Sequence, residues 1–348
     1  MKPDRLYLDH AATTPVLPVV REAMTDALAR WANPSSPHGE GRAARAALED
    51  ARKRIGKALN WDGEILFTSG ASEAIALALN GFDAVASAVE HDAVLSAIGD
   101  EARIAVDANG IAQLEPIAKG RRYAIQHVNN ETGIIQPLDE LGRVIREGDG
   151  LLVADCSQGA GKLPLPDADI IILSAHKLGG PPGLGALLTK DLGLLKPTGG
   201  QEKGYRRGTE NLPAVIGLAA ALEAEFDWLE QVIKLRAKLD AAIETAGGEI
   251  VGKPSPRLAT IGSYRMPGVS ASSQLISFDL AGIAVSAGSA CSSGTLKASH
   301  VLTAMGWDSK AASEVVRVSF GPQTGETDID RFVATWKAIR ERAAGAAL

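Results

Sequence analysis

The chain is poor in cysteine, with only Cys156 and Cys291 among its 348 residues. Two cysteines cannot form a disulfide framework, and the sequence has no Cys-x-x-Cys pair that would suggest a zinc site. These absences argue against a disulfide-stabilised secreted domain and against a zinc module. We therefore predict a reducing, cytoplasmic compartment.

The sequence also lacks long apolar runs and an excess of positive charge. No run is long enough to span a bilayer, and the first ten residues, MKPDRLYLDH, contain no apolar core of a signal peptide. The 36 Lys and Arg residues are outnumbered by 42 Asp and Glu, so that the net charge is −6. This balance argues against nucleic-acid binding driven by bulk charge. We expect neither a membrane nor a nucleic acid as a partner.

What the chain does have is a repeated alternation of short apolar runs with amphipathic segments. Its 45% of hydrophobic residues can bury a large core, in two domains or in one large one. Strands that alternate with helices predict an α/β fold with a mostly parallel sheet covered on both faces. The predicted strands of this sheet are 64–67, 84–89, 103–106, 123–128, 151–154, 170–173 and 185–188.

The pattern changes beyond residue 212. A single long helix is expected from Leu212 to about Thr245, where Gly247 and Gly248 end it, and it should link two domains. Strands near 249–251, 259–264 and 315–320, with helices around 272–280 and 328–343, predict a smaller α+β unit.

The segment from Asp169 to Gly185, DIIILSAHKLGGPPGLG, places Lys177 directly after a buried strand. Desolvation at such a place lowers the pKa of a lysine, and a neutral amine forms Schiff bases with aldehydes. Ser174 and His176 beside it offer hydrogen-bond donors to an anion. The segment therefore indicates a pyridoxal phosphate (PLP) lysine. The alternative is a lysine at a strand end with its head in water.

Polar residues follow five of the predicted strands. In a sheet of this kind ligands bind at the carboxyl ends of the strands, so these side chains should lie close together. They are Thr68 and Ser69, Glu90 and His91, Asn129 and Asn130, Asp155, and His176 with Lys177.

Residues that follow two of these strand ends suit the parts of a PLP molecule. Gly70, Ala71 and Ser72 open a helix whose N–H groups can cradle a phosphate, although a plain helix cap is the alternative. Asp155 could keep a pyridinium nitrogen protonated, or it could cap a loop. Gln158 could bond a ring hydroxyl or lie on the surface.

Other candidates lie elsewhere in the sequence. His91 can stack on a flat ring and relay protons, or be structural. Cys291 lies in a loop of small residues, SAGSACSSG, where an exposed and mobile thiol could be a nucleophile; Cys156 is expected to pack in the core. Arg317 could bind a carboxylate from inside a cleft, or lie on the solvent side of an edge strand. The basic loop from Gly204 to Thr209 could reach a phosphate across a subunit boundary, or be solvated.

Ten motifs together resemble the cysteine desulfurases of the class-V aminotransferase family. They run in the family's order from Leu8 to about Gly325: YLDHAATTP, NPSSPHGEG, FTSGASEA, VEHDAVL, VNNETGIIQP, ADCSQGAGKLP, SAHKLGGPPGLGAL, GGQEKGYRRGTEN, SAGSACSSG and VRVSFGPQT. The resemblance implies a type I PLP fold with a large domain at 15–229 and a small domain formed by 1–14 with 230–348. It also implies a homodimer that converts L-cysteine to L-alanine and keeps the sulfur as a persulfide.

The resemblance implies a role for each matching residue. Cys291 would carry the persulfide, Lys177 the Schiff base, and His91 would stack on the cofactor and act in catalysis. The further cofactor residues would be Ala71, Ser72, Asn130, Asp155, Gln158, Ser174, His176 and, from the neighbouring subunit, Thr209. Asn130 and Arg317 would hold the substrate carboxylate. No resident metal is implied, and Cys291 is the one candidate for a transient iron–sulfur ligand.

The loop around Cys291 is similar to the long loop of the iron–sulfur-assembly branch. A sulfur acceptor or an iron–sulfur scaffold protein is therefore expected as a partner. His10, Ser72, Ala154 and Pro182 depart from the family's usual Asn, Thr, Val and Lys, and a short C-terminal tail leaves the docking protein open. A transaminase or a selenocysteine lyase on the same fold, and a non-catalytic partner protein, remain as rival functions.

Overall fold

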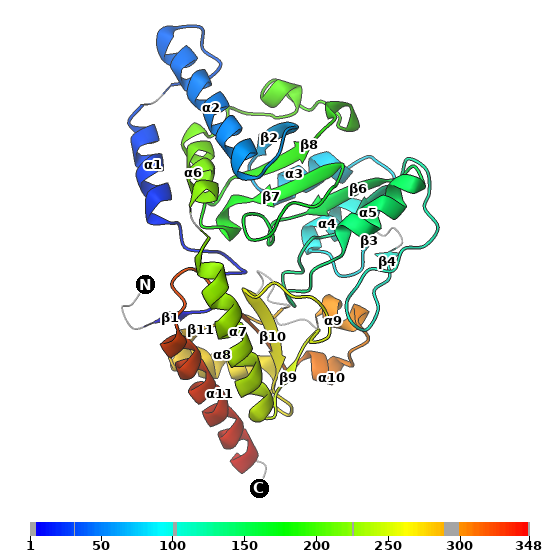
Figure 1. The fold of residues 1–348 in the computed structure, drawn as a ribbon, viewed down its shortest axis with the longest axis vertical. Coiled ribbons are helices and arrows are strands. Elements are labelled where there is room, and N and C mark those ends of the chain that lie inside the picture. The colour runs from blue at the N-terminus through cyan, green and yellow to red at the C-terminus, as the bar shows by residue number, and fades with distance from the viewer. Residues whose placement is uncertain (1–4, 31, 100–102, 225, 289–298, 347–348) are drawn as a thin grey trace.

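A computed structural model describes residues 5–30, 32–99, 103–224, 226–288 and 299–346 of the chain. Its centre is a seven-stranded sheet in the order β2-β8-β7-β6-β5-β3-β4 (Figure 1). β8 runs antiparallel to both of its neighbours, and the other neighbouring strands are parallel. The predicted mostly parallel α/β sheet is thereby confirmed. The strands are β2 (Glu64–Thr68), β3 (Ala84–Ser87), β4 (Arg103–Ile104), β5 (Arg122–Ala124), β6 (Leu151–Asp155), β7 (Ile170–Ser174) and β8 (Gly185–Thr189).

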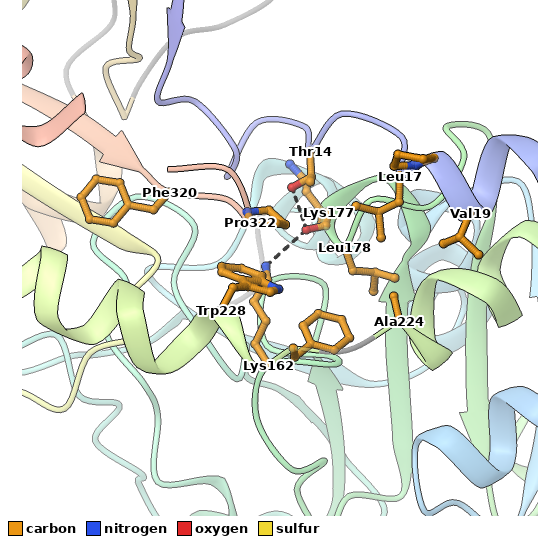
Figure 2. Close-up of a pocket in the computed structure, with 12 residues that line it drawn as sticks. Thr14, Leu17, Val19, Lys162, Lys177, Leu178, Ala224, Trp228, Phe320 and Pro322 are labelled. Atoms are coloured by element: carbon orange, nitrogen blue, oxygen red, sulfur yellow. Dashed lines mark hydrogen bonds between the residues drawn. The ribbon is translucent and has the colours of Figure 1, made fainter. Parts of the chain in front are cut away.

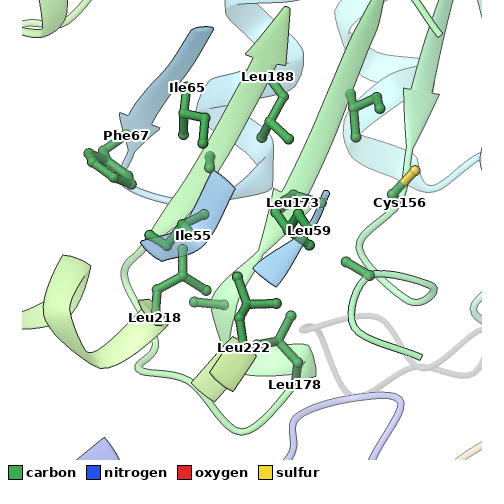
Figure 3. Close-up of a cluster of buried hydrophobic side chains, with 14 of the residues drawn as sticks. Ile55, Leu59, Ile65, Phe67, Cys156, Leu173, Leu178, Leu188, Leu218 and Leu222 are labelled. Atoms are coloured by element: carbon green, nitrogen blue, oxygen red, sulfur yellow. The ribbon is translucent and has the colours of Figure 1, made fainter. Parts of the chain in front are cut away.

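Helices cover both faces of this sheet, and successive side chains of a strand point alternately to the two helical layers. Ile171 and Leu173 of β7 pack with α1 (Pro18–Leu28), α2 (Gly39–Ala58), α5 (Leu138–Glu147) and α6 (Leu212–Glu223), in the cluster shown in Figure 3. Ile170 and Ile172 pack on the other side, with α3 (Ala71–Leu79) and α4 (Asp92–Ile98). Because both faces are buried, the strand reads as an unbroken apolar run.

Three strands of the sheet are shorter than expected, and the first of them, β3, ends at Ser87 rather than at Val89. β5 ends at Ala124 rather than at Val128, because the backbone N–H of Gln126 donates to the buried carboxylate of Glu90 (2.7 Å) instead of continuing a ladder. β4 ends at Ile104, and Val106 forms only an isolated bridge to Ala112.

A second unit is built on the antiparallel sheet β12-β10-β9. Its aromatic core contains Tyr264, Phe278, Phe332 and Trp336, all fully buried. The start of the chain joins this unit, since β1 (Leu6–Tyr7) pairs with β11 (Ile283–Ala284). The other elements are α7 (Trp228–Thr245), β9 (Glu249–Ile250), β10 (Ile261–Arg265), α8 (Ala271–Leu280), α9 (His300–Ala304), α10 (Ser309–Ala312), β12 (Val315–Ser319) and α11 (Glu326–Ala346), with short 3-10 turns at Ala175–Lys177, Leu192–Leu194 and Glu202–Gly204.

The expectation of one helix from Leu212 to Thr245 is wrong. α6 ends at Glu223, Ala224 is extended (ψ 143°), and α7 begins at Trp228. The two helices separate because α6 buries its apolar face in the core of the large sheet, whereas α7 packs in the core of the second unit. The domain boundaries at 14/15 and 229/230 stay a prediction. Across the described ranges, no helix is both long and apolar enough to cross a membrane.

Candidate active site

Lys177 lies where the central strand β7 turns into the 3-10 turn Ala175–Lys177. Its Nζ donates to the backbone oxygens of Ala11 (2.7 Å) and Ala12 (2.8 Å), which belong to the segment between β1 and α1. Burial, with a smaller contribution from Arg317, lowers the pKa of Lys177 to about 8, against the opposing effect of Asp155 and Asp9. The amine is therefore much more easily deprotonated than a solvated lysine.

The backbone of this turn is held from several sides. Thr14 donates its N–H to the carbonyl of His176 (2.9 Å) and its hydroxyl to the carbonyl of Lys177 (3.2 Å). The ammonium of Lys162 donates to the same Lys177 carbonyl at 3.2 Å. Gly179 follows with φ +81°, and a Cβ there would lie 2.6 Å from the side chain of Leu17. A side chain at residue 179 would therefore displace the turn.

Asp155 and Gln158 lie at the end of the neighbouring strand β6. Asp155 is 9% exposed, and its Oδ1 accepts the N–H of Ser157 (2.9 Å). Gln158 donates its Nε2 to Ala11 O (2.8 Å), the oxygen that also accepts from Lys177, and its buried Oε1 has no hydrogen-bond partner in the structure. Cys156 is buried in the core, as predicted, and burial raises the pKa of its thiol.

The start of α3 is open to an anion. Gly70 occupies the cap position, where it can provide no side-chain bond to the first-turn N–H groups of the helix. The start of β8 passes close by, since a Cβ on Gly185 would lie 2.5 Å from the carbonyl carbon of Gly70. The carboxylate of Glu73, in the first turn of α3, accepts the N–H of Ser69. This is part of the plain helix cap named above as the alternative, but its donor is the residue before the cap residue Gly70. Ala71 and Ser72 begin the helix at this opening.

Ser174 borders the same opening at the end of β7, and His176 follows it in the 3-10 turn Ala175–Lys177. Ser174 is buried and is paired across the sheet with Gly185. His176 lies 3.1 Å through its Nδ1 from the hydroxyl of Thr13. Burial, assisted by Lys177, lowers the pKa of His176 to about 4, so that its ring is neutral near pH 7. It can donate one N–H but adds no charge.

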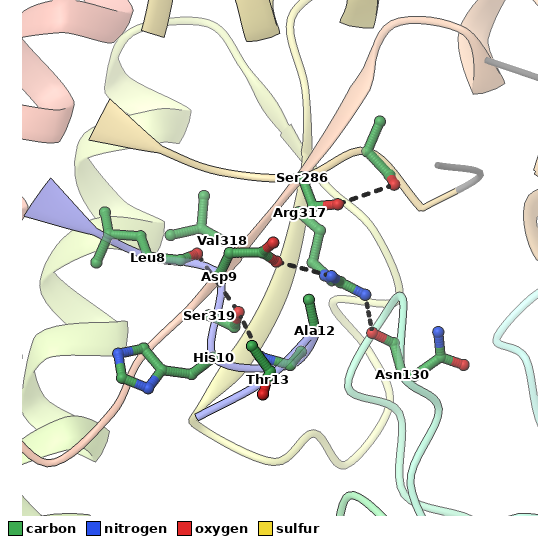
Figure 4. Close-up of polar contacts among 12 residues, drawn as sticks. Leu8, Asp9, His10, Ala12, Thr13, Asn130, Ser286, Arg317, Val318 and Ser319 are labelled. Atoms are coloured by element: carbon green, nitrogen blue, oxygen red, sulfur yellow. Dashed lines mark hydrogen bonds and ion pairs between the residues drawn. The ribbon is translucent and has the colours of Figure 1, made fainter. Parts of the chain in front are cut away.

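Arg317 of β12 connects the second unit to the large sheet (Figure 4). Its Nη2 donates to Asp9 Oδ1 (2.8 Å) and its Nη1 to the carbonyl of Asn130 (2.9 Å), while Nε is buried without a partner. Arg317 is 5% exposed, so the alternative of a solvent-facing arginine is wrong. In this structure the guanidinium of Arg317 contacts the carboxylate of Asp9.

His91 lies at the start of α4, where its Nδ1 accepts the N–H of Ala93 (3.1 Å) and its ring is exposed. This bond leaves Nε2 as the protonated nitrogen. The preceding Glu90 is fully buried, and burial raises its pKa, with Asp155 contributing in the same direction. Glu90 and His91 therefore place polar groups after β3, at the same edge of the sheet as Asp155.

Cys291 lies outside the described residues, but the residues on either side of its loop are described. Ser299 donates its hydroxyl to Glu131 Oε2 (2.6 Å), and a Cβ on Gly288 would lie 2.0 Å from the same atom. Glu131 directly follows Asn130, whose carbonyl binds Arg317. Both ends of the loop therefore meet beside the Arg317 site.

Thr209 is exposed and lies away from these contacts, in the loop before α6. In the same loop Arg206 donates to the carbonyl of Phe67 (3.2 Å) and lies 3.4 Å from Glu73, so this arginine is anchored rather than solvated. Arg207 is exposed.

Comparison with known proteins places the chain in a family. A model described as aminotransferase class-V matches residues 6–332. Cysteine desulfurase IscS 1 of Archaeoglobus fulgidus is 35% identical over 371 aligned residues, which cover 97% of each chain. The chain belongs to the cysteine desulfurases of the class-V aminotransferase family.

Further relatives of this desulfurase-family chain agree in length and fold. A putative cysteine desulfurase IscS 1 of Bacillus subtilis is 34% identical, with 91% of this chain and 94% of the relative covered. The crystal structure of a NifS-like protein from Rickettsia africae superimposes with a TM-score of 0.89 at 29% identity, over 97% and 99% of the two chains. A structure described as SspA in complex with cysteine has a TM-score of 0.79 at 30% identity, over 92% and 100%.

Enzymes of this family depend on PLP, and so does this family member. The predicted family, fold, enzyme class and cofactor are confirmed. The residues fit the group: the partnerless Oε1 of Gln158 is free for a ring hydroxyl, and the uncapped start of α3 is free for a phosphate. In the parts of the chain that the structure describes, no group of three or more His, Cys, Asp or Glu side chains could hold a metal ion.

Sequence reasoning did not single out three residues of the site. Asp9 pairs with Arg317, Glu131 accepts from Ser299 and lies against Gly288, and Lys162 binds the Lys177 carbonyl. All three lie inside the quoted family motifs. A charged residue inside an otherwise apolar or small-residue motif is the signal that could have identified them.

Proposed function

We propose that this family member removes sulfur from L-cysteine, releases L-alanine and retains the sulfur as a persulfide on Cys291. The proposal depends chiefly on one observation, the desolvated amine of Lys177 within the electrostatic influence of both Asp155 and Arg317. A carboxylate beside a pyridinium nitrogen, a low-pKa amine and a buried guanidinium are the groups that PLP chemistry on an amino acid requires.

Four side chains would hold the cofactor ring: Lys177 would bond PLP covalently, Asp155 would pair with its ring nitrogen, Gln158 would bond its ring hydroxyl, and His91 would stack on the ring. The start of α3, with Ser174 and His176, would hold the phosphate, because helix N-termini favour anions. The phosphate residues are Ala71, Ser72, Ser174, His176 and, from a second subunit, Thr209. When bound, PLP stabilises negative charge at the substrate's α-carbon.

The chain's own side chains would perform the remaining steps. Arg317 and Asn130 bind the substrate carboxylate, and the neutral amine of Lys177 removes the α-proton. The thiolate of Cys291 attacks the substrate sulfur: a sulfur–sulfur bond forms, the carbon–sulfur bond breaks, and its electron pair stays with carbon. A proton delivered to that carbon, with His91 as the donor, and return of the α-proton from Lys177 would complete alanine.

The visible spectrum of the purified holoenzyme, before and after L-cysteine is added, tests this function. We expect a PLP band that changes with cysteine, and alanine and persulfide that form in wild type but not in Cys291→Ala. The matched control Cys156→Ala removes the other thiol and should retain both products. Alanine release that is independent of Cys291 would favour a lyase or a transaminase, and strong preference for selenocysteine would favour a selenocysteine lyase. Failure to bind PLP would favour a non-catalytic protein.

We further propose a homodimer in which Thr209 reaches the partner subunit's phosphate site, since Thr209 is exposed in one chain. The persulfide sulfur would pass to an acceptor or an iron–sulfur scaffold protein in the cytoplasm, with Cys291 as the transient ligand. Mass measurement in solution tests the dimer. Mixed dimers that contain Lys177→Ala in one chain and Thr209→Val in the other test the shared site, because one of their two sites would carry both defects.

A further inference from the structure

A cavity of about 290 Å³ lies behind Lys177, at the boundary between the two units (Figure 2). Its apolar wall includes Leu17 and Val19 before and within α1, Phe226 between α6 and α7, Trp228 at the start of α7, and Phe320 after β12. Among the residues assigned above to PLP or to the substrate, only Lys177 lines it. The cavity is therefore distinct from the proposed cofactor site.

The side chain of Lys162 also lines the cavity. Its Nζ donates to the carbonyls of Gln158 (3.1 Å) and Lys177 (3.2 Å), and an ammonium has three donors. Within the described residues Lys162 forms no ion pair. Burial, followed by repulsion from Lys177, lowers its pKa to about 8, so it still carries its charge near pH 7. Buried charges in proteins are normally paired, which makes this ammonium an unsatisfied cation.

The size and the wall of the cavity limit what can bind there. Its volume is roughly twice that of an apolar cavity of ~150 Å³ that accommodates benzene. The rings of Phe226 and Trp228 are tilted by 36°, with 6.2 Å between their centroids, and offer an aromatic surface. Cavities with apolar walls and a few polar groups, located between domains, are typical of small-molecule sites.

We propose that this cavity binds a small aromatic carboxylic acid, with the carboxylate on Lys162 and the ring against Phe226 and Trp228. The charge-assisted bond to Lys162 selects a carboxylate, because an uncharged group would leave the ammonium unpaired. The site does not depend on the proposed desulfurase reaction.

Calorimetric titration of the holoenzyme near pH 7 with 3-phenylpropionate, and with its uncharged isostere 3-phenylpropanamide, tests the site. We expect the acid to bind saturably and the amide to bind about tenfold or more weakly. Lys162→Met should weaken binding of the acid by about tenfold and leave the affinity for the amide unchanged. Lys190→Met, which removes a charge from a lysine that is 62% exposed, is the matched control and should change neither.

A second variant keeps the test independent of any folding defect in Lys162→Met. Val19 is 47% exposed at the rim of the cavity, so Val19→Trp can fill the space without overpacking the core, and it should abolish binding of the acid. Equal affinity for acid and amide, or affinity for the acid that survives both variants, would overturn the proposal. So would competition by L-alanine, which would place the probe in the substrate site, or the absence of saturable binding up to about 10 mM.

Discussion

Lys177 and the residues that flank the Cys291 loop are held in very different ways. The Lys177 turn receives hydrogen bonds from Thr14 and Lys162, and its side chain donates to Ala11 and Ala12. Of the described residues that flank the Cys291 loop, Ser299 donates to the carboxylate of Glu131, and Gly288 lies against the same carboxylate. The difference follows from the two proposed tasks. Proton removal at a bound substrate needs a fixed amine, whereas a thiol that collects sulfur and delivers it elsewhere needs reach.

Removal of the fixed amine should have the largest effect. Lys177→Ala eliminates both the covalent link to PLP and the proposed base, so we expect alanine formation to fall by about 10³-fold or more, with loss of the visible band of wild type. Activity and absorbance measurements check this, and the exposed Lys190→Ala is the control. A variant that kept near-normal turnover would remove Lys177 from its proposed role.

The pKa of the fixed amine can be tested separately. Because only the neutral amine attacks an aldehyde and the pKa of Lys177 is lowered to about 8, the rate of PLP uptake by the apoprotein should rise with pH. The rise should be about tenfold per pH unit below pH 8 and should level off above it. Stopped-flow absorbance across pH 6 to about 9.5 measures the midpoint. A rate that still climbs steeply at the upper end would mean that Lys177 is solvated.

Loosening the anchor should produce a smaller and more selective defect. Ser299→Ala removes a bond to Glu131 and the cap of α9, so we expect persulfide formation to slow by about tenfold, while PLP binding is unchanged. Ser270→Ala removes the comparable cap of α8 away from Glu131 and should cost about 1 kcal/mol of unfolding free energy without slowing sulfur transfer. Equal rates of persulfide formation in Ser299→Ala and Ser270→Ala would contradict a role for the Ser299–Glu131 bond.

The smallest effect should come from the buried cysteine. Because Cys156 lies in the core with a raised pKa, Cys156→Ala should lower the free energy of unfolding by about 1 kcal/mol and change turnover less than twofold. Alkylation of the native protein, followed by mass spectrometry, should label Cys291 before Cys156. Faster labelling of Cys156 would reverse the assigned difference between the two thiols.

Much of the fold followed from local patterns. The unbroken apolar run of β7 predicted a doubly covered strand, and the glycines after Lys177 predicted the turn. The broken helix at Ala224 was missed because helix propensity does not show that two halves of a segment pack on different cores. The end of β5 was misplaced because the Glu90 side chain replaces a strand partner.

For the site, the order of amino acids established which chemical groups are present and, through the family motifs, which roles they resemble. The packing of distant segments established which of these groups meet. Asp9 and Arg317 are 308 positions apart and form one ion pair, and Ala11 accepts hydrogen bonds from both Gln158 and Lys177. Hydrophobic periodicity reports only the faces of single elements, whereas these contacts arise when the first residues of the chain pack between the two sheets. The Lys162 cavity has the same origin, because its walls come from five separate segments that no local pattern connects.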